Sequence, residues 1–446
     1  MRSSSLVCCL ALCGLLLMGC SARRGLRRLS PSDNHLSPAA SLVGGRPAYS
    51  FDLLRCGAER MELLLPLLQG RRVALFVNQS SVVGPAHVSL VDTLLSCGVE
   101  VTKIFVPEHG FRGDYDAGAA VAHDKDERTG LRIVSLYGNR RKPAAKDLRD
   151  VDVLVFDMQD VGCRFYTYIS SMHYAMEAAA EHDVEMIVCD RPNPNDYVDG
   201  PIRQPNCRSF VGVDPLPILH GLTIGELAQM INGEGWLGEN LSCRLTVIPM
   251  QGWRHGDPYS PPIPPSPNLK SDAAIKLYPS ICFFEATIMS VGRGTDCPFE
   301  LLGYPERHFG TFTFVPEPVE GASKPLYSGQ ICYGIDLVAH LRSEESDYLP
   351  RNFDGGLTLK PLLQAYRIAK EQNLKLINRK RIFELLVGNK TLIRQMEEGL
   401  SEEEIRATWQ EDLAQYRKIR ERYLLYPAKE MQETILSVRE VEYRTK

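Results

Sequence analysis

The chain has 446 residues, of which 44% are hydrophobic and 24% are charged, the balance of a folded protein of about two to three domains. This composition excludes a disordered chain and a collagen-like repeat. The formal net charge of -4 leaves no general basic surface for phosphates, so we expect no nucleic-acid partner.

The N-terminus has the pattern of an export signal. Arg2 precedes an apolar run over residues 6–18, which is short for a membrane span and typical of a signal peptide over residues 1–19. The run ends in Leu17-Met18-Gly19-Cys20, which resembles the bacterial lipobox. We therefore expect lipidation of Cys20 and an exported lipoprotein, membrane-anchored in the periplasm or at the cell surface. A simple secretory signal and an uncleaved anchor are the alternatives.

Residues 20–48 are rich in Ser, Arg and Pro and predict a flexible tether. After the tether, short apolar runs recur, each separated from the next by a helix-length segment. Such runs are typical of parallel strands buried on both faces, and their alternation with helices predicts a doubly wound, Rossmann-like α/β domain over residues 49–262. The predicted strands are 73–77, 99–106, 131–136, 151–156, 185–189 and 245–248.

Two intervening helices are expected, one with Val88, Val91, Leu94 and Leu95 on a single face and one over the alanine-rich residues 168–182. Residues 257–267 then contain six prolines, which cannot continue a helix or a central strand and so indicate a domain junction.

A mixed α/β domain that ends in helices is expected over residues 263–446. Ser401 and Glu404 have the spacing of a capping box that begins a helix. One face of that helix is predicted to carry Ile405, Trp409, Leu413 and Tyr416.

Polar side chains gather where the predicted strands end, and in an open parallel sheet ligands bind at the carboxyl ends of the strands. Acids and amides hydrogen-bond to sugar hydroxyls, while aromatic rings cover the apolar faces of a sugar. We therefore expect a sugar site built from Asn78, Gln79, Glu108, His109, Arg112, Asp157, Gln159, Asp160, Arg164, Tyr166, Tyr168, Asp190, Arg191 and Asn193.

Glu108 is the strongest candidate for a general acid. Glycoside hydrolysis by the common route needs two carboxyl groups, one protonated and one ionised. Glu108 lies between Pro107 and His109 directly after an apolar run, where partial desolvation would raise the pKa of its carboxyl group. The alternative, about equally supported by the local spacing, is a loop acid that caps a helix or pairs with Arg112.

Other chemistries lack their usual signals. Asp157 and Asp190 also fit a role in which a carboxylate accepts loop N–H groups and shapes a turn. His109 and His220 have no second ligand at metal-binding spacing, so we expect hydrogen-bonding histidines and no metal. The chain contains no dinucleotide fingerprint after a strand, no P-loop and no nucleophile elbow, and we expect no cofactor.

Arg293 stands between Gly292 and Gly294, beyond the proline-rich segment. Glycines on both sides allow a tight turn that presents the guanidinium, and an arginine so placed suits a carboxylate. The alternative is a structural bend with an exposed arginine.

At this point the ordered motifs resemble a known family, the exo-β-N-acetylmuramidases, glycoside hydrolases first catalogued as a domain of unknown function. The match covers nearly everything after the tether. It rests on Val106-Pro-Glu-His-Gly-Phe-Arg-Gly113, Asp157-Met-Gln-Asp-Val-Gly162, Arg164-Phe-Tyr-Thr-Tyr168, Asp190-Arg-Pro-Asn-Pro194, Pro265-Ser-Pro-Asn268 and Ser290-Val-Gly-Arg-Gly-Thr295.

The resemblance implies a Rossmann-like domain with a smaller C-terminal domain and a cleft between them. It also implies release of N-acetylmuramic acid from the non-reducing ends of peptidoglycan fragments. It assigns the acid role to Glu108 and adds Asn268 and Thr295 to the site. The family's Glu-Gly-Thr-Asn stretch appears here as Glu285-Ala286-Thr287-Ile288, with Glu285 a further catalytic candidate. Arg293, Arg112 and Arg164 are the candidates to bind the lactyl carboxylate of the sugar.

Two other functions stay open from the sequence. A lipid-anchored sugar or muropeptide solute-binding protein also pairs α/β domains around a sugar-sized cleft, but needs no general acid. An inactive wall-binding relative is the third, because Ala286 and Ile288 replace family residues.

Overall fold

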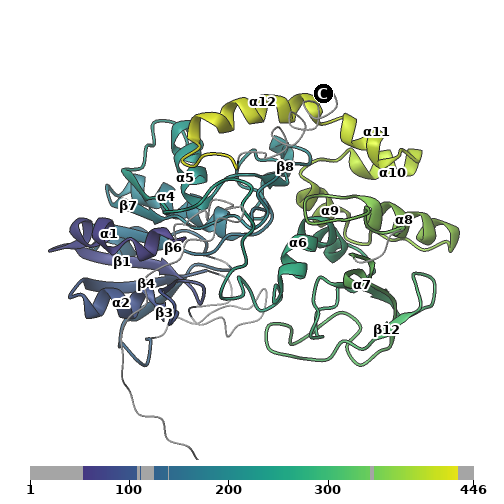
Figure 1. Cartoon of the computed structure of the whole chain (residues 1–446), viewed down its shortest axis with the longest axis horizontal. Helices are drawn as coiled ribbons and strands as arrows, with labels where there is room; N and C mark the ends of the chain where they lie inside the picture. The colour runs from purple at the N-terminus through teal and green to yellow at the C-terminus, as the bar shows by residue number, and fades with distance from the viewer. Residues whose placement is uncertain (1–53, 108–110, 112–124, 139, 342–345, 430–446) are drawn as a thin grey trace, which may run out of the picture. The chain divides into compact units, whose positions relative to one another are not determined.

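All six predicted strands form one parallel sheet in the computed structural model of the chain (Figure 1). The structure describes residues 54–107, 111, 125–138, 140–341 and 346–429. The strands are β1 (Arg72–Val77), β4 (Glu100–Val106), β5 (Arg132–Ser135), β6 (Val153–Asp157), β7 (Glu185–Cys189) and β10 (Leu245–Ile248).

The strand order is β10-β7-β6-β1-β4-β5, the order of a classical dinucleotide-binding sheet. β1 and β6 lie side by side in the middle of the sheet. β4 and β5 follow outward on the side of β1, and β7 and β10 follow outward on the side of β6. The loops that leave β1 and β6 diverge to opposite sides at the carboxyl edge, and this topological switch point is where such sheets bind ligands.

Helices cover both faces of the sheet, which confirms the doubly wound prediction. Alternate residues of β1 enter two separate cores, because successive side chains of a strand point to opposite faces. Leu75 packs in one core with residues of α1 (Met61–Leu68) and α2 (Leu90–Ser96). Phe76 packs in the other with residues of α4 (Tyr168–Glu181) and α5 (Ile224–Gly233).

One predicted helix begins later than its apolar spacing suggested. Val88 lies in a short strand, β3 (Val88–Ser89), that pairs antiparallel with β2 (Val82–Val83). α2 begins only at Leu90, so placing Val88 on a helical face was wrong. The remaining short elements here are α3 (Ala145–Leu148), β8 (Val198–Asp199) and β9 (Leu219–His220).

The C-terminal part is mixed α/β, as predicted, with a three-stranded antiparallel sheet in the order β11-β13-β12. Residues 257–267 form no helix or strand. The elements that follow are α6 (Asp272–Ile281), β11 (Leu301–Tyr304), β12 (Phe312–Phe314), β13 (Cys332–Asp336), α7 (Leu337–Leu341), α8 (Lys360–Glu371), α9 (Lys380–Val387), α10 (Leu392–Glu398), α11 (Glu402–Ala407) and α12 (Gln410–Arg420).

The predicted capping box is present at the start of α11. The Ser401 hydroxyl accepts a hydrogen bond from the Glu404 backbone N–H, and the Glu404 carboxylate accepts one from the Ser401 N–H. The apolar stripe is buried as predicted, but it spans two helices, since α11 ends at Ala407 and α12 begins at Gln410.

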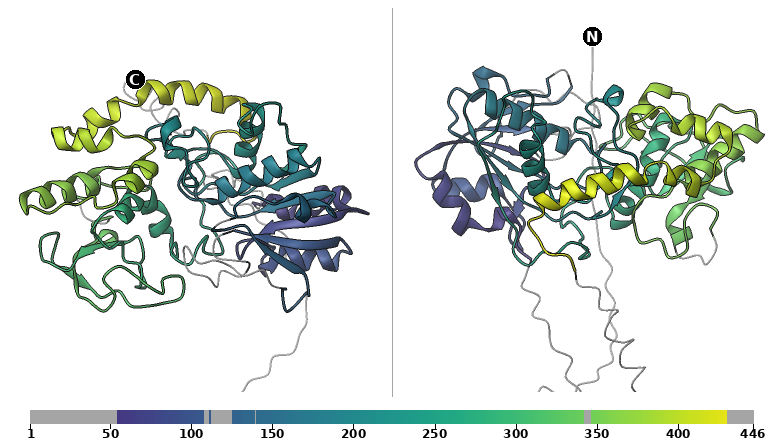
Figure 2. Two further views of the ribbon diagram at one scale, coloured as in Figure 1. Left: turned by 180° about the vertical axis from the view of Figure 1, so that it is seen from behind. Right: turned by 90° about the horizontal axis from the view of Figure 1, so that it is seen from above.

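α12 returns to the parallel-sheet part of the chain (Figure 2). Tyr416 donates a hydrogen bond to the backbone oxygen of His220, and Arg420 donates one to that of Gly221. The described residues between 54 and 429 accordingly form a single compact unit, and the boundary at residue 262 stays a prediction. Within the described ranges, no helix is both long and apolar enough to cross a membrane.

Candidate functional site

A pocket of about 300 Å³ lies between the loop that follows β6 and the beginning of the C-terminal part. Four predicted site residues that are far apart in the sequence meet in its wall: Tyr166 and Tyr168 from one side, and Glu285 and Arg293 from the other. The pocket is lined by Tyr137, Arg141, Phe165, Tyr166, Thr167, Tyr168, Phe210, Val211, Ser266, Leu269, Tyr278, Cys282, Glu285, Arg293, Phe299 and Leu386.

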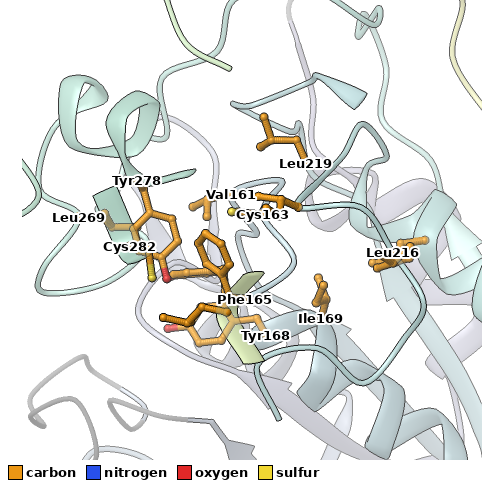
Figure 3. Close-up of a cluster of buried hydrophobic side chains, with 14 of the residues drawn as sticks. Val161, Cys163, Phe165, Tyr168, Ile169, Leu216, Leu219, Leu269, Tyr278 and Cys282 are labelled. Atoms are coloured by element: carbon orange, nitrogen blue, oxygen red, sulfur yellow. The ribbon is translucent and has the colours of Figure 1, made fainter. Parts of the chain in front are cut away.

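Edge-to-face aromatic contacts build one wall of the pocket (Figure 3). The Tyr166 ring lies 4.7 Å from that of Tyr168 and 6.0 Å from that of Tyr278, while Phe165 meets Tyr278 at 5.4 Å. Burial raises the pKa of the Tyr166 and Tyr278 hydroxyls well above the ordinary value, so both stay neutral. A fixed, uncharged aromatic wall of this kind suits the apolar face of a sugar ring.

Arg293 and Glu285 form an ion pair in the pocket. Arg293 Nε lies 2.6 Å from Glu285 Oε1 and Nη2 lies 3.2 Å from Oε2, and the guanidinium sits 5.0 Å from the centre of the Phe299 ring. Burial alone would lower the pKa of Arg293, but the Glu285 carboxylate raises it above the ordinary value. Gly292 and Gly294 both have positive φ, +76° and +84°, which only glycine adopts readily, so the tight turn was predicted correctly. The guanidinium is bound to a carboxylate of its own chain.

Asp157 and Arg191 form a second ion pair, at the switch point of the sheet. Arg191 Nε and Nη2 lie 2.5 and 2.8 Å from the two oxygens of Asp157, and both side chains are buried. Burial alone would lower the pKa of Arg191, but the facing Asp157 carboxylate raises it above the ordinary value. Each group therefore satisfies the other, and the pair fixes the loop after β7 to the end of β6.

Three buried polar atoms beside this ion pair have no hydrogen-bond partner among the described residues. They are Asn78 Nδ2, Gln79 Oε1 and Asp160 Oδ1. The rest of each side chain is held: Asn78 Oδ1 accepts from Ser80, Gln79 Nε2 donates to the backbone oxygens of Pro264 and Pro265, and Asp160 Oδ2 accepts from Gly162 N–H. Unpaired polar atoms in such positions are candidates for ligand hydroxyls.

Gln159, Asn268 and Thr295 are held in internal contacts. Gln159 Nε2 donates to the backbone oxygens of Asp160 and Pro192, and its Oε1 accepts from the Tyr259 hydroxyl at 3.2 Å. Asn268 Nδ2 donates to Gly321 O at 2.8 Å, and the Thr295 hydroxyl donates to Gly292 O at 2.6 Å. These residues shape the walls around the pocket.

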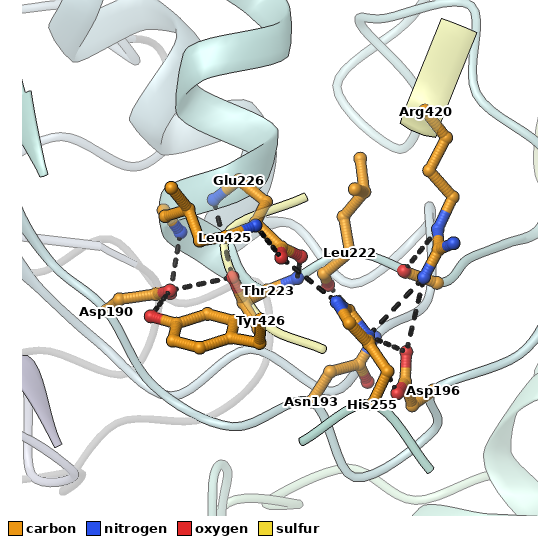
Figure 4. A network of polar contacts seen from close by, with 12 residues as sticks. Asp190, Asn193, Asp196, Leu222, Thr223, Glu226, His255, Arg420, Leu425 and Tyr426 are labelled. Atoms are coloured by element: carbon orange, nitrogen blue, oxygen red, sulfur yellow. Dashed lines mark hydrogen bonds and ion pairs between the residues drawn. The ribbon is translucent and has the colours of Figure 1, made fainter. Parts of the chain in front are cut away.

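Asp190 caps a helix, which corrects its placement among the substrate-binding residues (Figure 4). One oxygen accepts from Gly225 N–H, at the start of α5, and the other accepts from the hydroxyls of Thr223 and Tyr426 at 2.7 and 2.6 Å. Burial, with the nearby Glu226 carboxylate, raises the pKa of Asp190 to about 7. The interpretation as a turn-shaping acid is the one that the contacts support.

Asn193 is also held internally, because its Nδ2 donates to Leu222 O and its Oδ1 accepts from Asn195 N–H. Through these two contacts the side chain shapes the turn after β7.

Arg164 is a structural residue as well, and its proposed contact with the lactyl carboxylate is not supported. The side chain is fully buried, and its two terminal nitrogens donate to four backbone oxygens at 2.8 Å. Burial lowers the pKa of Arg164 to about 9. The carbonyls belong to Pro201, Leu216, Leu386 and Val387, so the side chain ties the loop after β6 to the end of α9.

Most residues that line the pocket were not predicted from the sequence, and Arg141 and Phe210 are two of them. Arg141 follows β5, so the rule that pointed to the ends of the other strands applies to it equally. Phe210 lies in a long irregular segment between β8 and β9, where no periodicity distinguishes it.

Glu108, His109 and Arg112 lie outside the described residues, so their positions relative to the pocket stay predictions. β4, which precedes them, ends at Val106, beside β1 in the same sheet. In the part of the chain that the structure describes, no group of three or more His, Cys, Asp or Glu residues could hold a metal ion.

Comparisons with known proteins agree over both parts of the chain. The family model for the N-terminal part of the exo-β-N-acetylmuramidase NamZ matches residues 73–273, and the model for its C-terminal part matches residues 276–426. The peptidoglycan β-N-acetylmuramidase NamZ of Bacillus subtilis (strain 168) is 36% identical over 377 residues, which cover 80% of this chain and 88% of that protein.

Two crystal structures of DUF1343 family proteins from Bacteroides fragilis NCTC 9343 share the fold. One is 40% identical with a TM-score of 0.74, and the other is 30% identical with a TM-score of 0.70. Each alignment covers 84% of this chain and 99% of the other.

Proposed function

Because this chain belongs to the exo-β-N-acetylmuramidase NamZ family, we propose that it is a glycoside hydrolase that releases N-acetylmuramic acid from the non-reducing ends of peptidoglycan fragments. The observation that carries the proposal is the match of both parts of the chain, together with a pocket whose walls come from both parts. The resemblance indicated by the ordered motifs is thereby confirmed.

In this proposal Glu108, which follows β4 in the sequence, delivers the proton to the leaving oxygen. Glu285 is the second carboxylate, which either attacks the sugar or activates water. It lines the pocket, and the bidentate contact with Arg293 fixes its orientation. The aromatic wall of the pocket holds the ring.

The Glu108→Gln variant tests the acid role. An amide cannot deliver a proton, so hydrolysis of a natural disaccharide should fall by ~10²- to 10⁴-fold, and hydrolysis of an activated aryl glycoside should fall less. Glu100→Gln is the matched control, because Glu100 is exposed at the opposite end of β4. Near-wild-type hydrolysis of the disaccharide by Glu108→Gln would overturn the assignment.

The rival solute-binding function makes the opposite prediction for the wild-type protein. A binder would retain a muramic acid glycoside without releasing its aglycone at any pH, whereas the proposed hydrolase releases it. Absence of turnover across the pH range would overturn the proposed activity.

The proposal extends to the cell envelope, where the substrate is found. The lipobox-like Leu17-Met18-Gly19-Cys20 and the preceding apolar run support an exported lipoprotein, anchored through Cys20 in the periplasm or at the cell surface. Expressed in bacteria, the wild-type protein should enter the detergent phase in a phase-separation experiment and Cys20→Ser the aqueous phase. Identical partitioning of the two would overturn the anchor.

A further inference from the structure

We propose that Arg141 binds the lactyl carboxylate and so selects N-acetylmuramic acid over N-acetylglucosamine, an inference that rests on the proposed function. The two sugars differ by a lactyl ether that carries a carboxylate. A residue that distinguishes them must therefore present a positive charge, or donors for an anion, next to the ring-binding surface.

Among the described residues that line the pocket, one positive charge has no acidic partner. These residues include three charged side chains, Arg141, Glu285 and Arg293. Arg293 and Glu285 neutralise each other through their bidentate contact. Arg141 forms no ion pair with any residue that the structure describes. Among the described lining residues the positive charge of Arg141 is therefore not neutralised, which favours an anionic group beside it.

The two basic neighbours of Arg141 are already engaged. Arg140 pairs with the buried carboxylate of Asp147, and Lys142 Nζ lies 3.1 Å from Glu177 and 2.7 Å from Glu181, both on α4. These contacts fix the backbone on both sides of Arg141 against the core of the domain. Of the three consecutive basic side chains, only that of Arg141 faces the pocket without an acidic partner.

Aromatic side chains hold the guanidinium of Arg141. Its central carbon lies 4.3 Å from the centre of the Phe210 ring, within cation–π distance. Phe210 in turn stacks on Tyr174 of α4, with ring planes 10° apart. One face of the guanidinium is covered in this way, while the N–H groups at its edge are left for a carboxylate, which an arginine binds through two parallel hydrogen bonds.

The size of the pocket fits the same ligand. About 300 Å³ is at the lower end of the range for small-molecule sites, which suits one sugar unit with its lactyl group. The aromatic wall at Tyr166 and Tyr168 lines the same pocket as Arg141, so ring and carboxylate can be bound together.

A substrate-modification experiment tests the inference. We would measure kcat/KM for aryl glycosides of N-acetylmuramic acid, of its neutral lactyl amide and of N-acetylglucosamine, using wild type, Arg141→Met and Arg141→Lys. Arg141→Met should lower kcat/KM for the acid on the order of 100-fold and change it less than about threefold for the two neutral sugars. Lysine should restore only a small part, because it lacks the planar fork.

Arg149→Met is the matched control, since Arg149 is exposed and lies outside the pocket. An equal loss on the acid and on the amide, or an unchanged ratio between them, would overturn the role of Arg141. A second measurement does not depend on turnover. By calorimetry, free N-acetylmuramic acid should bind more weakly to Arg141→Met than to the wild type. Equal affinities would overturn the inference. If the wild type binds the sugar but hydrolyses no glycoside, the proposed activity fails and the calorimetry still decides the role of Arg141.

Discussion

At the scale of single residues, Arg164 shows how a buried charge can hold two parts of a chain together without an acidic partner. Its guanidinium is surrounded by four carbonyl oxygens, two of them from the last turn of α9, where the helix dipole favours a cation. Gly388 follows that turn with φ +85°, and a Cβ atom there would lie 2.5 Å from Arg164 Nη2. The Arg164 side chain can therefore occupy this position only because residue 388 is a glycine.

Replacing Arg164 by methionine should destabilise the fold strongly. The substitution leaves four buried carbonyl groups without donors, and we expect a loss of about 3–5 kcal/mol in the free energy of unfolding. Chemical denaturation measures the loss. The same substitution at the exposed Arg149 should change stability by less than about 0.5 kcal/mol, and a similar small effect at Arg164 would contradict the structural role.

The sequence pattern does not distinguish polar residues that would bind a ligand from those that support the fold. A polar residue after a strand looks the same in both roles, because its partner decides the role and that partner is often remote in the sequence. Asp190 meets Tyr426, and Arg164 meets Leu386. For Tyr166, Tyr168, Glu285 and Arg293 the expected convergence is present, since all four line one pocket.

At the scale of elements, the parallel strands were predictable because the four central ones, β7, β6, β1 and β4, are largely buried on both faces and therefore form nearly continuous apolar runs in the sequence. The small sheet β11-β13-β12 left no such signal. Its strands are three to five residues long, and Gly303 and Gly334 pair across β11 and β13. A Cβ atom at Gly334 would collide with the backbone of Leu302, and one at Gly303 would collide with the Phe314 ring. Short strands with paired glycines have neither alternation nor a β-rich composition.

The segment after α12 contains Tyr426, and the contribution of its hydroxyl group to the stability of the fold can be measured. The Tyr426 hydroxyl donates to Asp190 and accepts from Met250 N–H, and both contacts are buried. Tyr426→Phe removes the two hydrogen bonds and leaves Asp190 short of a donor, so we expect a loss of about 1–3 kcal/mol in the free energy of unfolding. Tyr423→Phe, at a partly exposed hydroxyl bonded to Glu234, is the control and should lose less. Equal losses in the two variants would contradict the prediction.

At the scale of the whole molecule, a buried network of ionisable groups makes stability depend on pH. His255 lies 2.9 Å from Asp196 and 3.0 Å from Glu226, and Arg420 approaches it at 3.4 Å (Figure 4). Burial alone would lower the pKa of His255, but hydrogen bonds to the two carboxylates raise it to about 9.

The melting temperature should fall as the pH rises from 5 to 9. The folded state binds a proton on His255 more tightly than the unfolded chain, so this contribution is full below about pH 6.5 and is lost as the pH approaches 9. The raised pKa of Asp190 acts in the same direction, between about pH 4 and 7. Thermal denaturation across this range checks the slope.

His255→Gln should flatten that slope above pH 6.5 and leave the part due to Asp190 below it. A melting temperature that is constant or rises with pH in the wild type would contradict the prediction. An unchanged slope in His255→Gln would show that other groups cause it.

The fold can be completed during synthesis only after Leu425 and Tyr426, near the end of the described chain, have been made. Every strand of the parallel sheet precedes residue 249, yet Asp190 and Glu226 receive Tyr426 and Leu425 only from near the end of the chain. A growing polypeptide folds from its N-terminus first. A nascent or prematurely terminated chain would therefore hold the whole sheet but bury a carboxylate without its tyrosine, which leaves it more exposed to cellular proteases than the finished protein.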